Sequence, residues 1–207
     1  MRIGIDFDNT IICYDPLFVQ AAQDLGLLST PQTNWDKPRI RDHIRRQADG
    51  ELKWQQLQAE VYAHRLPQAR PKPGVQHALQ QLAKAGFELV VVSHKTQHAK
   101  QDPHQVDLRQ GARTWLQAHG FFKRGGGLDP QKLYFEPTRD EKIARITQLQ
   151  CRLFVDDLIE VLTHPDFPPQ TQAVLFAPCH ADGAERPYDH FTHWAEIETA
   201  LLDGTLV

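Results

Sequence analysis

The chain alternates short runs rich in β-branched and other apolar residues with longer stretches of helical periodicity, and this alternation restricts its fold more than any other feature. Five runs are predicted to be strands: Arg2 to Ile5, Phe87 to Val92, Lys132 to Phe135, Arg152 to Val155 and Gln172 to Phe176. The second run is almost wholly apolar, as is typical of a strand buried on both faces. The pattern therefore predicts an α/β fold with a mainly parallel sheet covered by helices.

Helical patterns fill the gaps between these runs. One helix is predicted to begin at Pro73-Gly74 and to end at Gly86. Two more are predicted from about Val106 to His119 and from His190 to Leu202. At 207 residues, the chain has room for one core domain with a small accessory module.

Charge and composition exclude several classes of function. The formal net charge of −3 argues against broad electrostatic binding to a nucleic acid polymer, and no apolar run approaches the roughly 20 residues that cross a bilayer. The N-terminal residues lack the apolar stretch of a secretory signal. Cys13, Cys151 and Cys179 show no CxxC spacing and are interpreted as reduced thiols. We therefore expect a cytoplasmic protein without a membrane partner; its oligomeric state stays open.

Polar side chains stand where three of the predicted strands end. Asp6 and Asp8 follow the first strand, Ser93 follows the second, and Asp156-Asp157 follow the fourth. Ligands bind at the carboxyl ends of the strands in open α/β sheets. Each residue alone would also serve as a cap of the next helix, and for Ser93 the two interpretations are equally good. Four acids in this order favour a single polar site.

The acidic residues of this site are expected to need a cation. Asp6 and Asp8 are two residues apart, so a regular strand would point both side chains the same way. Two carboxylates about 4 Å apart repel by roughly 1–4 kcal/mol at effective dielectric constants of about 80 to 20. A cation or raised pKa values would relieve this repulsion. Oxygen ligands without His or Cys suit Mg²⁺, and the alternative is a helix-capping pair with one solvated carboxylate.

A lysine is predicted near the same site. Thr138 to Glu141 match a capping box, which places Lys142 in the first turn of a helix. The helix dipole disfavours a cation there, so Lys142 is better explained if it meets an anion. A solvated lysine is the alternative, and Lys95 and Lys132 also stand near strand ends.

The order Asp-x-Asp-x-Thr, strand-terminal Ser, Lys and paired Asp resembles the four motifs of the haloacid dehalogenase superfamily of phosphatases, matched over residues 2 to 157. The resemblance implies a Rossmann-like three-layer sandwich with a small α-helical cap. It also implies a magnesium-dependent phosphohydrolase that removes phosphate from a small-molecule phosphate ester through an aspartyl-phosphate intermediate. Superfamily members that dehalogenate lack an acid at the position of Asp8, so its presence favours phosphate chemistry.

The resemblance also implies roles for individual residues. Asp6 would be the nucleophile and Asp8 the general acid and base, while Ser93 and Lys142 would contact the phosphoryl oxygens. The Mg²⁺ ligands would be the Asp6 side chain, the Asp8 backbone carbonyl and Asp156, with Asp157 in support. The candidates for substrate binding are Asn9, Thr10, His94 and Lys95. Asn9 stands where the motif often has Gly, and Asn tolerates the same unusual backbone conformations.

The segment between the first two motifs is expected to be the cap. Residues 17–25, 39–47 and 51–65 have helical patterns. The resemblance implies that an insertion at this point is a cap over the active site, so we expect a core of residues 1–13 and 73–207 and a cap of residues 14–72. The resemblance also implies that a helical cap this short favours small substrates. Its basic residues and tryptophans are interpreted first as a solvated helix face and as core packing, and second as substrate contacts: Arg39, Arg41, Arg45, Arg46, Trp35 and Trp54.

Three other classes of protein could use a similar set of residues. A phosphotransferase of the same mechanism stays open. A non-catalytic phospholigand-binding regulatory protein would not need an acid at position 8. A phosphorylation-switch receiver domain carries its phosphorylated Asp on a later strand than its acidic pair, so the order of motifs here is wrong for that class.

Overall fold

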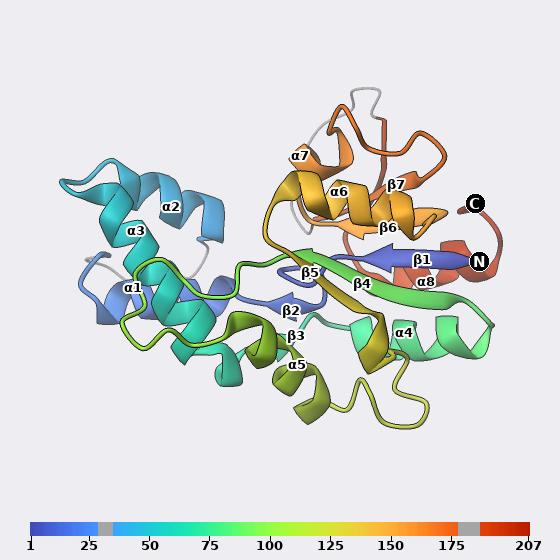
Figure 1. The fold of residues 1–207 in the computed structure, drawn as a ribbon, viewed down its shortest axis with the longest axis horizontal. Helices are drawn as coiled ribbons and strands as arrows, with labels where there is room; N and C mark the ends of the chain where they lie inside the picture. The colour runs from blue at the N-terminus through green and yellow to red at the C-terminus, as the bar shows by residue number, and fades with distance from the viewer. Residues whose placement is uncertain (29–34, 178–186) are drawn as a thin grey trace. The chain divides into compact units, whose positions relative to one another are not determined.

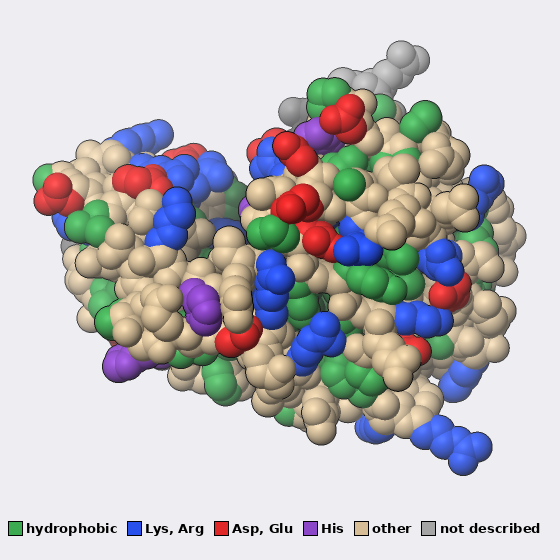
Figure 2. All heavy atoms as spheres, in the orientation of Figure 1, with side chains coloured by type: hydrophobic (Ala, Val, Ile, Leu, Met, Phe, Trp, Pro, Cys, Tyr) green, Lys and Arg blue, Asp and Glu red, His purple; other side chains and the backbone are tan. Residues whose placement is uncertain are grey.

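The computed structural model describes residues 1–28, 35–177 and 187–207, and the chain divides into two compact units (Figure 1). Unit 1 comprises Met1–Ile11, Pro71–Lys95 and Leu116–Val207, and unit 2 comprises Ile12–Arg70 and Thr96–Trp115. Cys179 lies outside the described residues. Among the helices of the described ranges, none is both long enough and apolar enough to cross a membrane. Acidic and basic side chains are interspersed on the face that Figure 2 shows.

Unit 1 is built on a six-stranded sheet in the order β5-β4-β1-β6-β7-β8. All the pairings between its neighbouring strands are parallel. The strands are β1 (Arg2–Ile5), β4 (Glu88–His94), β5 (Leu133–Glu136), β6 (Leu153–Asp156), β7 (Gln172–Phe176) and β8 (Asp189–Phe191). The first five lie within a residue or two of the predicted strands. Since β1 has β4 on one side and β6 on the other, the chain changes direction across the sheet at β1, which is where such sheets bind ligands.

Strand β8 corrects the prediction of one long helix from His190. Residues 189–191 instead pair with β7 at the edge of the sheet, and helix α8 (Trp194–Leu202) begins only after them. The Glu196 carboxylate accepts hydrogen bonds of 3.0 Å from the backbone N–H groups of Thr192 and His193. This capping arrangement fixes the start of the helix and leaves the preceding residues extended.

Helices cover both faces of the sheet, which confirms the three-layer α/β sandwich (Figure 1). Helices α6 (Arg139–Gln148) and α7 (Ile159–Leu162) lie on one face, and α4 (Val75–Lys84) and α8 lie on the other. Alternate residues of the strands, such as Val90 and Val92, pack with Ile143 and Ile146 of α6 in one buried cluster. The alternation explains why the strands are apolar on both faces.

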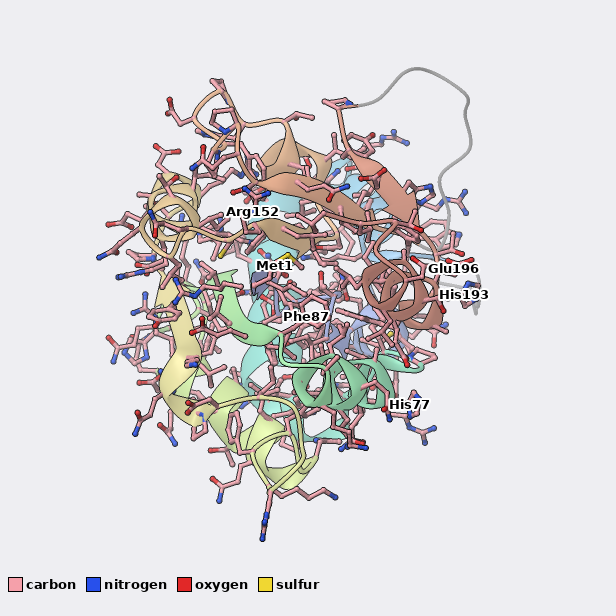
Figure 3. All side chains as sticks on the ribbon, turned by 90° about the vertical axis from the view of Figure 1, so that its right-hand side faces the viewer. Met1, His77, Phe87, Arg152, His193 and Glu196 are labelled. Atoms are coloured by element: carbon pink, nitrogen blue, oxygen red, sulfur yellow. The ribbon has the colours of Figure 1, made fainter. Side chains whose placement is uncertain are left out.

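The strand starts form the opposite edge of the sheet from the polar residues. Met1, Phe87 and Arg152 stand side by side there, as Figure 3 shows. The Met1 carbonyl accepts a 2.9 Å hydrogen bond from the backbone N–H of Glu88. Lys132 also belongs to this edge, because its ammonium lies 3.0 Å from the Glu88 carboxylate.

Unit 2 is mainly helical. It contains α1 (Asp15–Asp24), α2 (Lys37–Arg45), α3 (Gly50–Ala59), a π-helical turn (Glu60–His64), a 3₁₀ turn (Leu66–Gln68) and most of α5 (Leu108–Ala118). The short strands β2 (Ile12–Cys13) and β3 (Arg70–Pro71) pair where the chain enters and leaves the first of its segments. Phe18 stacks on Trp54 with ring centroids 5.4 Å apart, and Trp54 is buried. Core packing is therefore the role of Trp54.

The second segment of unit 2 differs from the predicted domain boundaries, which placed residues 96–115 in the core. Ala99 and Leu108 pack in one buried cluster with Ala59, the last residue of α3. The buried Asp102 carboxylate is also 3.1 Å from His64 Nε2. The segment Thr96–Trp115 follows β4 in sequence but belongs to the helical unit 2. An apolar contact and a buried polar contact join it to the first segment of that unit.

Asp102 is expected to be a stability determinant of unit 2. Its carboxylate accepts backbone hydrogen bonds from His104 (3.0 Å) and Val106 (2.8 Å) as well as the His64 contact. Burial alone would raise the pKa of Asp102, but these donors outweigh it and hold the pKa below its ordinary 3.8. A lowered pKa contributes stability that is present above the ordinary value and is lost as the pH falls through the folded-state value. Asp102→Asn should therefore lower the thermal midpoint at neutral pH and flatten the acid limb of the stability curve.

Circular-dichroism melts from about pH 3 to about pH 7 would test this expectation. The exposed Asp166→Asn variant is the matched control and should melt like the parent protein. Equal midpoints for Asp102→Asn and the parent at neutral pH would contradict it.

Candidate active site

The carboxyl ends of β4, β1 and β6 bring the motif residues to one edge of the sheet. Ile5 pairs with Val91 on one side and with Val155 on the other. The backbone N–H of Asp6 extends this register with a 2.9 Å hydrogen bond to the Val155 carbonyl. Asp6 and Asp156 therefore stand at the same level of neighbouring strands, and Ser93 lies one residue further along β4.

Lys142 joins two of the acidic residues. Its Nζ donates hydrogen bonds of 2.6 Å to Asp6 Oδ1 and 2.6 Å to Asp156 Oδ2. The lysine side chain is 2% exposed, and the two carboxylates are 5% and 0% exposed. Of the three lysines considered from the sequence, Lys142 is the one that reaches Asp6, while Lys132 lies at the other edge of the sheet.

The start of helix α6 positions Lys142. As predicted, Thr138 is the N-cap, and its hydroxyl oxygen accepts a 3.2 Å hydrogen bond from the Glu141 backbone N–H. The Glu141 carboxylate in turn accepts from the Thr138 hydroxyl at 2.8 Å. The cap starts the helix one turn before Lys142, so that the side chain points from the first turn into the acidic cluster.

The cluster carries more negative charge than its lysine neutralises. Burial raises the pKa of Asp6 to about 7, with further increases from the carboxylates of Asp156 and Asp8 and an opposing effect of Lys142. Burial lowers the pKa of Lys142, but the attraction of Asp156 and Asp6 outweighs it and the pKa is raised overall. The lysine is therefore charged at neutral pH, and its ammonium does not suffice to keep the buried Asp6 carboxylate fully ionised.

Asp157 completes a set of oxygen donors that fits a hard cation. Oxygens of Asp6, Asp156 and Asp157 lie within 4.8 Å of one another. The other oxygen of Asp156 accepts a 3.0 Å hydrogen bond from the Leu158 backbone N–H, which orients this carboxylate. Three carboxylates without His or Cys match the ligand preference of a hard divalent cation. The Asp8 side chain does not belong to this set.

Asp8 instead pairs with Lys95. The lysine Nζ lies 2.9 Å from Asp8 Oδ1 and 3.0 Å from Oδ2. Asn9, which follows Asp8 in the chain, adopts the left-handed conformation (φ = 57°) that Asn tolerates better than most residues. The sequence pattern indicates a substrate contact at Lys95 and does not predict this ion pair. The sequence feature that would indicate this ion pair is the position of Lys95, a lysine just after a strand that ends near several acidic residues.

Two hydroxyls near the strand ends have no hydrogen-bond partner among the described residues. They are Ser93 Oγ and Thr10 Oγ1, and both side chains are buried. Buried hydroxyls are nearly always hydrogen-bonded, so each of these two has capacity to bind a ligand. His94, in contrast, is exposed, and its Nε2 lies 3.0 Å from the Pro137 carbonyl.

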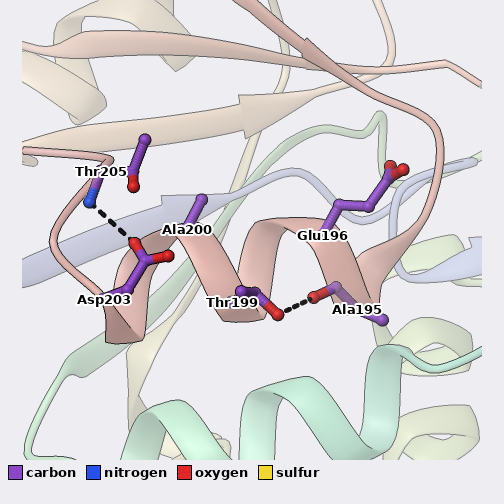
Figure 4. Close-up of a pocket in the computed structure, with 6 residues that line it drawn as sticks. All are labelled: Ala195, Glu196, Thr199, Ala200, Asp203 and Thr205. Carbon is purple, nitrogen blue, oxygen red and sulfur yellow. Dashed lines mark hydrogen bonds between the residues drawn. The ribbon is translucent and has the colours of Figure 1, made fainter.

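A surface hollow along α8 is separate from these residues. Figure 4 shows that Thr199 Oγ1 donates to the Ala195 carbonyl (2.9 Å) and that the Thr205 N–H donates to Asp203 (2.9 Å). Its lining consists of Ala195, Glu196, Thr199, Ala200, Asp203 and Thr205. Because its polar groups bond within their own segment and no motif residue lines it, the hollow is not the candidate site.

Comparisons with known proteins add structural neighbours. No family model and no curated protein sequence matches the chain. A haloacid dehalogenase-like family hydrolase from Xanthomonas campestris has a TM-score of 0.57 at 10% identity, covering 98% of this chain and 95% of its own. A similar hydrolase from Deinococcus radiodurans, solved with bound phosphate and sodium, has a TM-score of 0.56 at 14% identity and covers 100% and 96%.

A predicted phosphatase from Clostridium acetobutylicum has a TM-score of 0.56 at 13% identity and covers 98% of both chains. The agreement extends over essentially the whole length of each protein. The chain has the haloacid dehalogenase-like fold. In this chain, that fold carries an acid or a hydroxyl at the carboxyl ends of the three central strands, at Asp6, Ser93 and Asp156.

Proposed function

We propose that this protein is a magnesium-dependent phosphohydrolase that removes phosphate from a small-molecule phosphomonoester, with Asp6 as the nucleophile. The observation that supports the proposal most is the buried Lys142 ammonium, 2.6 Å from both Asp6 and Asp156. It places a fixed positive charge beside a carboxylate that a phosphate ester could approach. The Ser93 hydroxyl, buried and without a partner among the described residues, adds a donor for a phosphoryl oxygen.

In the first step, an Asp6 carboxylate oxygen attacks phosphorus and the bond from phosphorus to the ester oxygen breaks. Asp8 gives its proton to that oxygen, so the product leaves as a neutral alcohol and Asp6 carries the phosphoryl group. In the second step, Asp8 takes a proton from water as the water attacks phosphorus. The bond from Asp6 to phosphorus then breaks, which releases inorganic phosphate and restores the carboxylate.

Negative charge develops on the phosphoryl oxygens in both steps. Hydrogen-bond donors that the fold already positions would stabilise this charge. Lys142 and Ser93 would contact these oxygens, with Asn9, Thr10 and the backbone N–H groups after Asp6 as further candidates. The side chains of Asp6, Asp156 and Asp157 would hold Mg²⁺, together with the Asp8 carbonyl oxygen. Such an ion neutralises charge on the nucleophile and on the transferring group.

Unit 2 is proposed to be the cap that limits the site to small substrates. This proposal extends the predicted cap of residues 14–72 by the second segment, Thr96–Trp115. The thiols of Cys13 and Cys151 are free, which suits a reducing compartment, and we propose a cytoplasmic location.

Metal removal is expected to abolish turnover. With p-nitrophenyl phosphate and a panel of sugar and nucleotide phosphates, a chelator should lower phosphate release by about 100-fold or more, and added Mg²⁺ should restore it. The reason is that the three carboxylates alone would repel a phosphate dianion. An alcohol acceptor in the same assay separates the hydrolase from a phosphotransferase, because a transferase passes most of the phosphoryl group to the alcohol and releases little inorganic phosphate. Absence of turnover on the whole panel, with a folded protein that binds Mg²⁺, would refute the proposal.

A further inference from the structure

The contact between Lys95 and Asp8 assigns a role to a lysine outside the four motifs. We infer that Lys95 is a positioning residue that holds the Asp8 carboxylate in one orientation for its proton transfers, and that it does not bind substrate. The inference rests on the proposed function, because it concerns the residue that would act as acid and base. It replaces the sequence-based expectation of a substrate contact at Lys95.

The geometry of the pair restricts the carboxylate. The Lys95 ammonium is nearly equidistant from the two Asp8 oxygens, at 2.9 and 3.0 Å. The terminal torsion of Asp is otherwise broad, so a single hydrogen bond would leave the group able to turn. Contact with both oxygens opposes that rotation, and the charge on both partners strengthens the contact.

Lys95 is itself fixed by the surrounding structure. Its backbone N–H donates a 2.9 Å hydrogen bond to the Glu136 carbonyl, which continues the pairing of β4 with β5. Its ammonium also lies 5.4 Å from the centre of the buried Phe7 ring. Phe7 in turn meets Phe135 edge-on, with ring centroids 6.5 Å apart. Lys95 is therefore fixed by its position at the end of β4 and by its hydrogen bond to β5. A fixed ammonium restricts the motion of the Asp8 carboxylate that it contacts.

Exposure distinguishes positioning from substrate binding. The Lys95 side chain is 5% exposed, whereas the Asp8 carboxylate is 21% exposed. An incoming ester would thus meet the carboxylate more readily than the ammonium that lies against it. Lys142 already supplies a cation for the phosphoryl group, so substrate binding does not require Lys95 as a second cation.

Steady-state and burst kinetics of Lys95→Met test the inference. We expect kcat to fall by about tenfold or more while KM changes by less than about threefold, because a mobile Asp8 impairs chemistry and not binding. The rate of phosphoenzyme formation should fall more for an alkyl phosphate than for p-nitrophenyl phosphate, whose leaving group needs little protonation. Lys95→Arg should restore part of the rate, since a guanidinium can also donate to both oxygens. Lys84→Met, at an exposed lysine of α4, is the control and should match the parent enzyme.

A second measurement does not depend on activity. Quantitative acetylation followed by mass spectrometry should find Lys95 less reactive than Lys84 in the parent protein and distinctly more reactive in Asp8→Asn. A large rise in KM with unchanged kcat would overturn the inference in favour of direct substrate contact, and equal losses for both leaving groups would leave only a structural role. If Lys95 is protected by Asp8 but the parent enzyme turns over no phosphate ester, the proposed function fails and the positioning role fails with it.

Discussion

Asp6→Asn is expected to reduce phosphate release by about 10⁴-fold or more, because a neutral amide cannot attack phosphorus to form the covalent intermediate. Asn is close to Asp in size, so the buried position can retain its packing. The substitution removes one of the two carboxylates that Lys142 contacts. One ammonium would then face one buried carboxylate, which is a balanced pair. The variant should therefore be folded and inactive.

The stability of the metal-free variant provides a second readout. In the parent protein the pKa of Asp6 is raised to about 7 by burial, so the folded state binds more protons than the unfolded state between about pH 4 and about pH 7. The free energy of unfolding contributed by this group therefore falls as the pH rises, by at most about 1.4 kcal/mol per pH unit. Asp6→Asn should lose this slope. Denaturant titrations at several pH values in the presence of a chelator would measure it.

Asp8→Asn is the matched control for the nucleophile, since it changes another acid of the same motif in the same way. It should lose turnover but retain the ability to form a phosphoenzyme from a reactive aryl phosphate. Beryllium fluoride should likewise bind to the parent protein and not to Asp6→Asn. Turnover by Asp6→Asn within about tenfold of the parent would contradict the assignment of the nucleophile.

The strands can be predicted from the sequence because each central strand is buried on both faces and appears in the sequence as a continuous apolar run. Val90 and Val92 pack toward α6, while the buried Val91 between them faces the other layer. The polar residues at the strand ends predict which side chains lie close together. The capping box at Thr138 indicates that Lys142, and not Lys95 or Lys132, contacts Asp6. These features follow from local periodicity, from helix-start chemistry and from the rule that parallel strands end at one edge.

Contacts between segments that are distant in the sequence cannot be predicted in this way. Asp8 and Lys95 are 87 residues apart, and His64 and Asp102 are 38 apart. No local pattern records which of several lysines or acids will be brought together by the packing of other elements. The helix expected over residues 51–65 shows the same limit, because α3 ends at Ala59 and continues as a π-helical turn that carries His64. Tertiary contacts decide such details.

Lys142→Met is expected to have the largest combined effect on activity and stability. Loss of the ammonium removes the proposed donor to the phosphoryl group, so turnover should fall by about 10³-fold. It also leaves the carboxylates of Asp6 and Asp156 buried without their shared partner. Breaking a buried ion pair from one side costs about 3–5 kcal/mol, and the metal-free variant should be destabilised by a comparable amount at neutral pH.

The pH dependence of Lys142→Met identifies the cause of the destabilisation. Lys142 holds the pKa of Asp6 down against the effect of burial, so without the lysine that pKa rises further. A protonated Asp6 is neutral, and the variant should therefore lie closer to the parent in stability at about pH 5 than at about pH 8. Added Mg²⁺ should recover part of the stability without recovering turnover. Lys132→Met removes an exposed ion pair with Glu88 (37% and 35% exposed) and should cost about 1 kcal/mol or less. If the two lysine variants unfold alike at every pH, Lys142 does not hold the acidic cluster together.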